Sequence, residues 1–375
     1  MRNGSLFTCE IQINPLYTEL PLTECDPYIR GIVRWMNELG IYTHGSCDGH
    51  GKGPANILLL KYLTFPQKRL LLAAAPAALR LRIHGKSIYI HYKNRNHLLD
   101  FGENLFTLSQ IPEAITRLEA EHFKHRLIEL LTIPGVSQEE RRIRQFLQRR
   151  LDQLTDYTYV DRKGNLMAMK NCGTGPTILL SAHMDTVDDI VPDREIIEEG
   201  TMLKSSAGIL GADDRAGIAV ILEILSAIQQ TNFNGTLKVA FTVEEEIGCR
   251  GSREIDQDFL EDVTGAIVID RRGNRDIVTS YANFIPFCPT EYGKLFEKAG
   301  ELAGMNDWQM TPGGLSDAKI FAEMGIPSVN LSAGYANEHT DWETVDYLAT
   351  YETFTLVEAL LHHNLIGKNE TPEQM

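Results

Sequence analysis

The feature that most constrains the fold is a series of short apolar segments, each followed at once by acidic or histidine side chains. These are residues 178–182 before His183-Met184-Asp185, residues 239–243 before Glu244-Glu245-Glu246, and residues 266–269 before Asp270. Segments with the apolar spacing of helices lie between them. Short buried strands that alternate with helices predict an α/β fold, a mixed and mostly parallel sheet covered by helices on both faces. Ligands bind such sheets at the carboxyl ends of the strands.

The first third of the chain has a different character, with many histidines and short mixed segments. We predict an accessory α+β domain at residues 1–105 and a catalytic domain at residues 113–368. The elements expected in the first domain are helices at 25–39 and 65–74, a strand at 56–60 and a hairpin at 79–91. In the second domain, Ser137 and Glu140 fit a capping box that opens a helix reaching about Leu154.

Composition narrows the class of protein and its partners. The chain has 43% hydrophobic and 23% charged residues among 375, which is ordinary for a globular protein. Its net charge of −15 argues against nucleic acid or an anionic membrane as the main partner. No apolar stretch is long enough to span a membrane, and the N-terminus lacks the apolar core of a signal peptide. Six cysteines without a Cys-x-x-Cys pair suggest reduced thiols in a cytoplasmic protein.

The polar residues after the strands predict a metal site. Several carboxylates at one sheet edge would repel one another and lose their charge unless cations offset them. His183 and His339 are the two histidines within this stretch, and both follow predicted strands. Two imidazoles beside carboxylates favour one or two zinc ions, with cobalt or manganese as alternatives.

An ordered set of motifs carries a family resemblance. The motifs are His183-Met184-Asp185-Thr186, Gly211-Ala212-Asp213-Asp214-Arg215-Ala216-Gly217, Glu245-Glu246-Ile247-Gly248, Asp270, Gly313-Gly314-Leu315-Ser316-Asp317-Ala318 and His339. Together they resemble the co-catalytic di-zinc exopeptidases, and most of all the tripeptidase-T and carboxypeptidase-G type. The resemblance covers roughly residues 113–365.

The resemblance implies a role for each matched residue. The implied ligands of two divalent ions are His183, Asp213, Glu246, Asp270 and His339. Asp213 would bridge both ions, and its peptide bond to Asp214 would be cis. Asp185 would hold the ring of His183 through its other nitrogen. Glu245 would be the general base, although the run of three glutamates leaves the register open.

The implied activity is hydrolysis of amide bonds in short peptides by a water molecule that the metal activates, with Glu245 as base. An Asp at position 270 accompanies the aminopeptidases of the family, which favours cleavage from the N-terminus. Two enzymatic alternatives are an N-acyl amino acid deacylase and a carboxypeptidase. A non-catalytic peptide-binding relative is the alternative from another class.

Three features depart from the family pattern or stay open. Segment 271–338 is too short for the lid domain that many members carry, so residues 1–105 are expected to cover the cleft or to form a homo-oligomer. Arg272, Gly314 and Ser316 are candidates for substrate binding. Residues 43–53 are either a glycine-rich surface turn or a metal or ligand loop built from His44, Cys47, Asp48 and His50.

Overall fold

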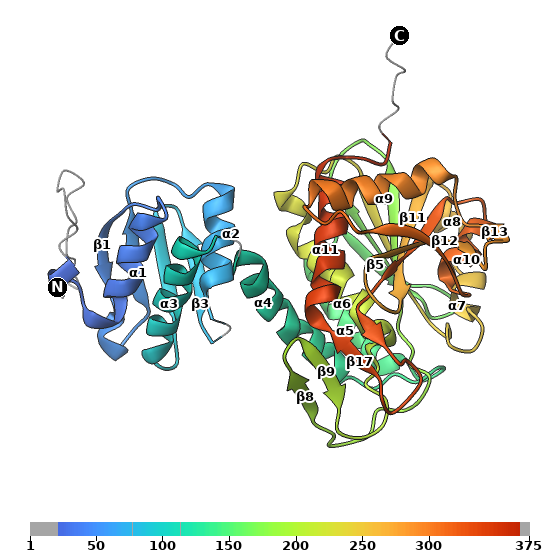
Figure 1. Ribbon diagram of the computed structural model, residues 1–375, viewed down its shortest axis with the longest axis horizontal. Coiled ribbons are helices and arrows are strands. Elements are labelled where there is room, and N and C mark those ends of the chain that lie inside the picture. The colour runs from blue at the N-terminus through green and yellow to red at the C-terminus, as the bar shows by residue number, and fades with distance from the viewer. Residues whose placement is uncertain (1–21, 77, 113, 368–375) are drawn as a thin grey trace, which may run out of the picture. The chain divides into compact units, whose positions relative to one another are not determined.

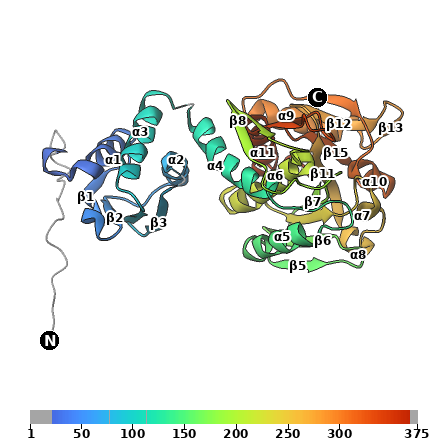
Figure 2. The same cartoon turned by 90° about the horizontal axis from the view of Figure 1, so that it is seen from below.

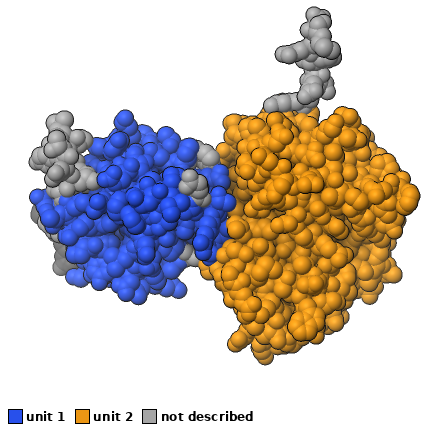
Figure 3. All heavy atoms as spheres, viewed as in Figure 1, with its two compact units in different colours: residues 1–122 blue, residues 123–375 orange. Residues whose placement is uncertain are grey.

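The computed structural model describes residues 22–367, except residues 77 and 113 (Figure 1). Cys9 and the N-terminal residues considered for a signal peptide lie outside this described part. The chain forms two compact units, Met1–His122 and Phe123–Met375 (Figure 3). Helix α4 (Ala114–Leu131) contains the boundary between them. No helix among the described residues has both the length and the apolar character that crossing a membrane requires.

Unit 1 is built on a four-stranded antiparallel sheet with strand order β1-β2-β4-β3. Its elements are η1 (Leu22–Glu24), α1 (Pro27–Glu38), β1 (Thr43–Cys47), η2 (Gly49–Gly51), β2 (Ala55–Leu59), α2 (Phe65–Ala74), β3 (Arg80–His84), β4 (Ser87–His91) and α3 (Asn96–Gln110). One face of the sheet is buried, with Ile57, Ile88 and Ile90 in the core, whereas Tyr89 points to the exposed face. This alternation is typical of a sheet that helices cover on one side only.

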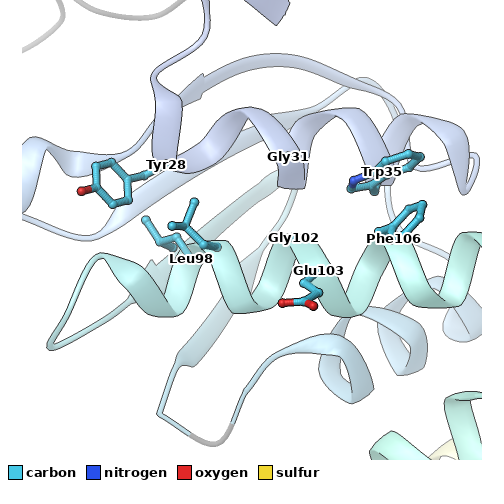
Figure 4. Close-up of a pocket in the computed structure, with 8 residues that line it drawn as sticks. Tyr28, Gly31, Trp35, Leu98, Gly102, Glu103 and Phe106 are labelled. Atoms are coloured by element: carbon cyan, nitrogen blue, oxygen red, sulfur yellow. The ribbon is translucent and has the colours of Figure 1, made fainter.

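Helices α1 and α3 approach each other closely where Gly31 faces Gly102. A shallow apolar groove lies along this crossing, with Tyr28 toward one end and Trp35 and Phe106 toward the other (Figure 4). The ring centroids of Trp35 and Phe106 are 4.7 Å apart. Because Gly31 and Gly102 have no side chains, the backbones of α1 and α3 can pack closely at this crossing.

Unit 2 is organised around a nine-stranded sheet. Its elements after α4 are α5 (Arg141–Leu154), β5 (Tyr157–Val160), β6 (Leu166–Asn171), β7 (Thr177–His183), β8 (Ile196–Glu199), β9 (Met202–Ser205), α6 (Ala212–Ala227), η3 (Ile228–Gln230), β10 (Thr236–Thr242), α7 (Arg250–Arg253), α8 (Gln257–Leu260), β11 (Val263–Arg271), β12 (Asp276–Tyr281), β13 (Ile285–Pro286), α9 (Thr290–Leu302), β14 (Gln309–Gly313), α10 (Asp317–Glu323), β15 (Ser328–Ser332), β16 (Tyr335–Ala336), β17 (Thr344–Asp346) and α11 (Tyr347–His362).

The centre of this sheet is parallel, as predicted. Strands β15, β11, β7 and β10 pair in parallel, and antiparallel strands such as β6 and β12 flank them. Helices α6 and α11 pack together against the sheet, and α10 packs on its other side (Figure 2). The core beneath α10 contains Leu179, Val268 and Phe321. The mixed α/β fold with helices on both faces is therefore confirmed.

A second, smaller sheet of unit 2 has the order β16-β17-β9-β8. The chain between His183 and Asp213 supplies its β8–β9 hairpin. The chain between Asp270 and Gly313 forms β12, β13, α9 and β14, which belong to the main sheet and its helical cover. Both segments therefore form part of the sheets and the helical cover of unit 2.

Two local predictions are wrong. The capping box at Ser137 and Glu140 does not form, because Ser137 donates instead to Asp185 Oδ2 at 2.7 Å. Glu140 is the residue before α5, and its side chain accepts a hydrogen bond from the Gln138 N–H at 2.9 Å. The second error concerns residues 43–53: the interpretation as a glycine-rich turn misses strand β1, which pairs with β2.

Candidate active site

The residues expected as metal ligands come together in unit 2 from five places in the chain. His183 ends β7, Asp213 lies in the first turn of α6, Glu246 follows β10, Asp270 lies near the end of β11, and His339 lies between β16 and β17. Strands β10, β7 and β11 are neighbours in the parallel part of the sheet. Their carboxyl ends therefore reach the same edge, which is why their terminal side chains converge.

Asp213 lies between two groups of ligand-type side chains. Its Oδ1 is 3.0 Å from His183 Nε2, and its Oδ2 is 3.2 Å from His339 Nε2. Asp270 Oδ1 completes the first group at 3.6 Å from His183 Nε2, and Glu246 Oε2 completes the second at 2.9 Å from His339 Nε2. One carboxylate is thus shared by two His-and-acid triads, the geometry expected of a residue that bridges two ions.

Buried acids hold Asp213 in this position. The peptide bond between Asp213 and Asp214 is cis, as the resemblance implied. Glu343 accepts hydrogen bonds from the Gly211 and Asp213 N–H groups at 2.7 and 3.0 Å. Asp214 accepts from the His183 and Gly217 N–H groups at 3.2 and 3.0 Å. These contacts fix the start of α6 against the end of β7.

Asp185 connects residues of both groups. The His183 Nδ1 atom lies 3.0 Å from the Asp185 main-chain oxygen and 3.4 Å from its Oδ1. The same carboxylate accepts from the Glu245 and Glu246 N–H groups at 3.0 and 3.1 Å, and from Ser137. Asp185 therefore holds the His183 ring and also the backbone that presents Glu245 and Glu246.

Glu245 lies beside the shared carboxylate without belonging to either triad. It lines the same pocket as Asp213, Asp270 and His339. Its Oε1 is 3.1 Å from Cys249 Sγ, and burial, followed by the nearby charge of Asp317, raises the pKa of that thiol strongly. A raised pKa disfavours the thiolate that a nucleophilic cysteine requires.

The electrostatics of the site are those of crowded carboxylates. Burial raises the pKa of Glu246 to about 8 and that of Asp270 to about 6, in both cases against the effect of His183. Burial and the charge of Asp270 raise the pKa of Glu245 well above its ordinary value. Burial would also raise the pKa of Asp213, but hydrogen bonds from His183 and His339 hold it below the ordinary value.

These residues fit a pair of divalent ions. The donor set contains imidazole and carboxylate groups only, which suits zinc and related metals. Glu246 Oε1 is buried and has no hydrogen-bond partner among the described residues, so it has a lone pair to offer. Dications would also offset the burial and the mutual repulsion that raise the carboxyl pKa values.

The candidate substrate residues differ in position. Arg272 and Gly314 line the pocket, whose volume is about 160 Å³, but Ser316 does not and is buried. Arg272 is paired with Glu338 at 2.7 Å, and Arg271 with Asp276 at 3.3 Å. The two arginines among the described lining residues therefore both have carboxylate partners.

Sequence reasoning missed several residues that shape the site. Asn330 accepts from the Asp270 N–H and donates to its carbonyl oxygen, both at 2.9 Å, and the Tyr335 hydroxyl donates to Asp270 Oδ1 at 3.0 Å. Asn330 lies between Val329 and Leu331 in the buried strand β15, and an amide at this place could have marked it. Ser137 and Glu343 give no such local signal, because their partners are far away in sequence.

The fold and this geometry are those expected of a hydrolase of the zinc-exopeptidase type. The sequence model of peptidase family M28 matches residues 165–363, just over half of the chain. The chain belongs to peptidase family M28. The expected likeness to peptidase T is also confirmed, as a distant similarity.

Two curated relatives match shorter segments. The uncharacterized protein YqjE of Bacillus subtilis (strain 168) is 33% identical over 99 residues, covering 26% of this chain and 27% of YqjE. Peptidase T of Escherichia fergusonii is 34% identical over 102 residues, covering 27% of this chain and 23% of that protein. The chain thus spans about a quarter of the length of these two relatives.

Solved structures support the same fold. Aminopeptidase PepT from Bacillus cereus ATCC 10987 superimposes with a TM-score of 0.58 at 18% identity, covering 65% of this chain and 98% of that one. The Pyrococcus horikoshii TET1 peptidase, which can assemble into a tetrahedron or a large octahedral shell, gives 0.53 at 18%, covering 64% and 99%. At this identity the likeness establishes the fold.

Proposed function

We propose that the protein is a metal-dependent aminopeptidase that removes residues from the N-terminus of short peptides. The observation that carries the proposal is the pair of triads that share Asp213, with Glu245 beside them. His183 and Asp270 would hold one zinc ion, Glu246 and His339 the other, and Asp213 both. When bound, such ions polarise the scissile carbonyl and lower the pKa of a coordinated water to about 7.

Glu245 is the side chain proposed to move the proton. It would accept the proton of the attacking water and deliver it to the nitrogen of the leaving amine, so that water is added across the amide bond. The hydrogen bond from its own N–H to Asp185 fixes its backbone next to the ligand Glu246. A general base needs such a fixed position within reach of the water.

The charges around the pocket support recognition of a free amino group. Both described arginines of the lining are already paired with carboxylates, so a peptide carboxylate would have to compete for them. Glu338 Oε1 is held by Arg272, whereas its buried Oε2 has no hydrogen-bond partner among the described residues. An unpaired buried carboxylate oxygen in the same pocket suits the α-ammonium of a peptide.

Replacing Glu338 by Gln is expected to raise KM for a free-amine dipeptide about 10- to 100-fold, with kcat changed less than about threefold. The reason is the loss of a charge-assisted hydrogen bond to the ammonium group in the bound substrate. Steady-state kinetics at constant metal content measure the split between KM and kcat. The matched control is Asp341→Asn, an exposed acid outside the pocket lining, which should leave both constants unchanged.

Replacing Asp185 by Asn is expected to weaken metal affinity about 10- to 100-fold, because the His183 ring and the Glu246 backbone lose their common acceptor. Competition with a fluorescent zinc chelator gives the dissociation constants. Ser137→Ala removes one hydrogen bond to the same carboxylate and should cost about tenfold at most. Wild-type affinity in Asp185→Asn would contradict the role given to this residue.

A panel of blocked peptides tests the proposed activity. We expect the zinc-loaded protein to cleave dipeptides and tripeptides with a free amino group, including those amidated at the C-terminus, and to reject N-acetylated ones. Preference for the N-acylated set would favour the deacylase alternative, and a need for a free carboxylate would favour the carboxypeptidase. Inertness of the metal-loaded protein toward the whole panel would favour a peptide-binding relative.

A further inference from the structure

Unit 1 contains a second gathering of metal-ligand side chains, at the end of β1. Asp26, Cys47, Asp48 and His50 each place a potential ligand atom within 4.8 Å of the others. They come from the residue before α1, the end of β1 and the following turn η2. We propose that Asp26, Cys47 and His50 bind a zinc ion here, with Asp48 orienting the histidine. This inference is independent of the proposed peptidase activity.

The cysteine and histidine already have the spacing of zinc ligands. Cys47 Sγ lies 3.7 Å from His50 Nε2. Sulfur and nitrogen bound to one tetrahedral zinc ion, at about 2.3 and 2.0–2.1 Å, lie about 3.6 Å apart. The Gly49 N–H points at Cys47 Sγ at 3.4 Å, so the sulfur accepts a hydrogen bond within the same turn.

Asp48 lies where the orienting carboxylate of a zinc-bound histidine belongs. Its Oδ1 is 3.3 Å from His50 Nδ1, which leaves Nε2 to face Cys47. Asp48 is completely buried, and its other oxygen pairs with Arg95. The Asp48 charge is therefore balanced by Arg95 without the ion, so this acid serves better to position His50 than to bind zinc.

Asp26 is the third proposed ligand, and its carboxylate is turned toward the cluster. Asp26 is the N-cap residue of α1, yet its side chain makes no capping hydrogen bond to the helix. Its Oδ2 instead accepts from the Asp48 N–H at 3.2 Å. One thiolate and one carboxylate would neutralise a zinc ion, and shifts of about 1 Å would complete the ligand distances.

Such an ion would join the start of α1 to the end of β1. Because His50 is partly exposed, the fourth position of a tetrahedral ion would be open to a water molecule. The thiolate distinguishes this site from the peptidase centre, whose proposed ligands are His183, Asp213, Glu246, Asp270 and His339. Cys249 also lies near two acids of unit 2, Glu245 and Asp317, so a metal–sulfur signal is assigned to unit 1 by comparing Cys47→Ser with Cys249→Ser.

The test is cobalt substitution in the full-length protein. After chelation, titration with Co²⁺ should produce a thiolate-to-cobalt charge-transfer absorption in the near ultraviolet, and zinc should abolish it. Cys47→Ser should remove this absorption and reduce zinc bound at saturation by one ion per chain, while peptide cleavage stays within about twofold. His50→Gln should weaken zinc binding at this site at least about tenfold.

Matched controls separate this site from other thiols and from misfolding. Cys172→Ser changes a partly buried thiol outside the cluster and should keep the absorption. Circular dichroism of Cys47→Ser and His50→Gln shows whether unit 1 is folded. The proposal is overturned if folded wild-type protein shows no absorption, if Cys47→Ser keeps it, or if Cys249→Ser removes it.

Discussion

Replacing Glu245 by Gln is expected to lower kcat for peptide hydrolysis by about 10²- to 10⁴-fold while both metal ions stay bound. Glu245 lies in the pocket beside the shared Asp213, but neither triad includes it. The amide of glutamine keeps the size of the side chain and cannot accept the proton of the attacking water. Steady-state kinetics together with metal analysis by mass spectrometry measure both parts of the expectation.

The matched control is the preceding residue of the same glutamate run. Glu244 is not among the described residues that line the pocket and pairs with Lys163 at 3.0 Å, so Glu244→Gln should change kcat less than about threefold. Comparing the two variants also shows which glutamate of the run of three is the base. Full activity of Glu245→Gln, or equal losses in both variants, would refute the assignment of the base.

Replacing Asp213 by Ala is expected to abolish tight binding of both metal ions and to lower kcat/KM by at least about 10³-fold. The expectation follows from the position of its carboxylate, which approaches His183 with one oxygen and His339 with the other. Metal analysis after gel filtration measures the ions retained, and added zinc should not restore full activity.

His339→Ala is the informative comparison for Asp213→Ala. His339 belongs to one triad only, so its loss should release one ion and leave the other with His183, Asp213 and Asp270. In the wild-type protein, chelation should remove activity and added zinc should restore it. If Asp213→Ala keeps both ions of the peptidase centre tightly bound, the shared-ligand arrangement is wrong.

Local patterns were sufficient for the architecture of unit 2. Buried parallel strands need continuous apolar runs, and residues 178–182 and 266–269 have this character. They lie in β7 and β11, within the parallel core of the sheet. The carboxyl ends of neighbouring strands share one edge, so the position of His183 and Asp270 could be predicted from sequence alone. Unit 1 was less clear, and β1 was missed because Thr43–Cys47 contains glycine and polar residues.

The contacts that support the site could not be predicted in this way. The Ser137 pattern matches a capping box within one turn of chain, but its hydroxyl bonds Asp185. Glu343 binds backbone N–H groups at Gly211 and Asp213. Hydrogen bonds of this kind depend on which segments pack together after folding, and the local periodicity of the sequence does not predict that packing.

The sequence by itself determined the α/β class and which acids and histidines stand at the strand ends, since both follow from apolar periodicity and chain order. Only the tertiary structure decided that Asp213 lies between the two imidazoles, that Arg272 is already paired, and that Glu338 keeps an unpaired oxygen. It also brought Asp26 to Cys47 and His50. The physical reason is that strand formation depends on neighbours in sequence, whereas side-chain pairing depends on distances of a few ångströms that long-range packing sets.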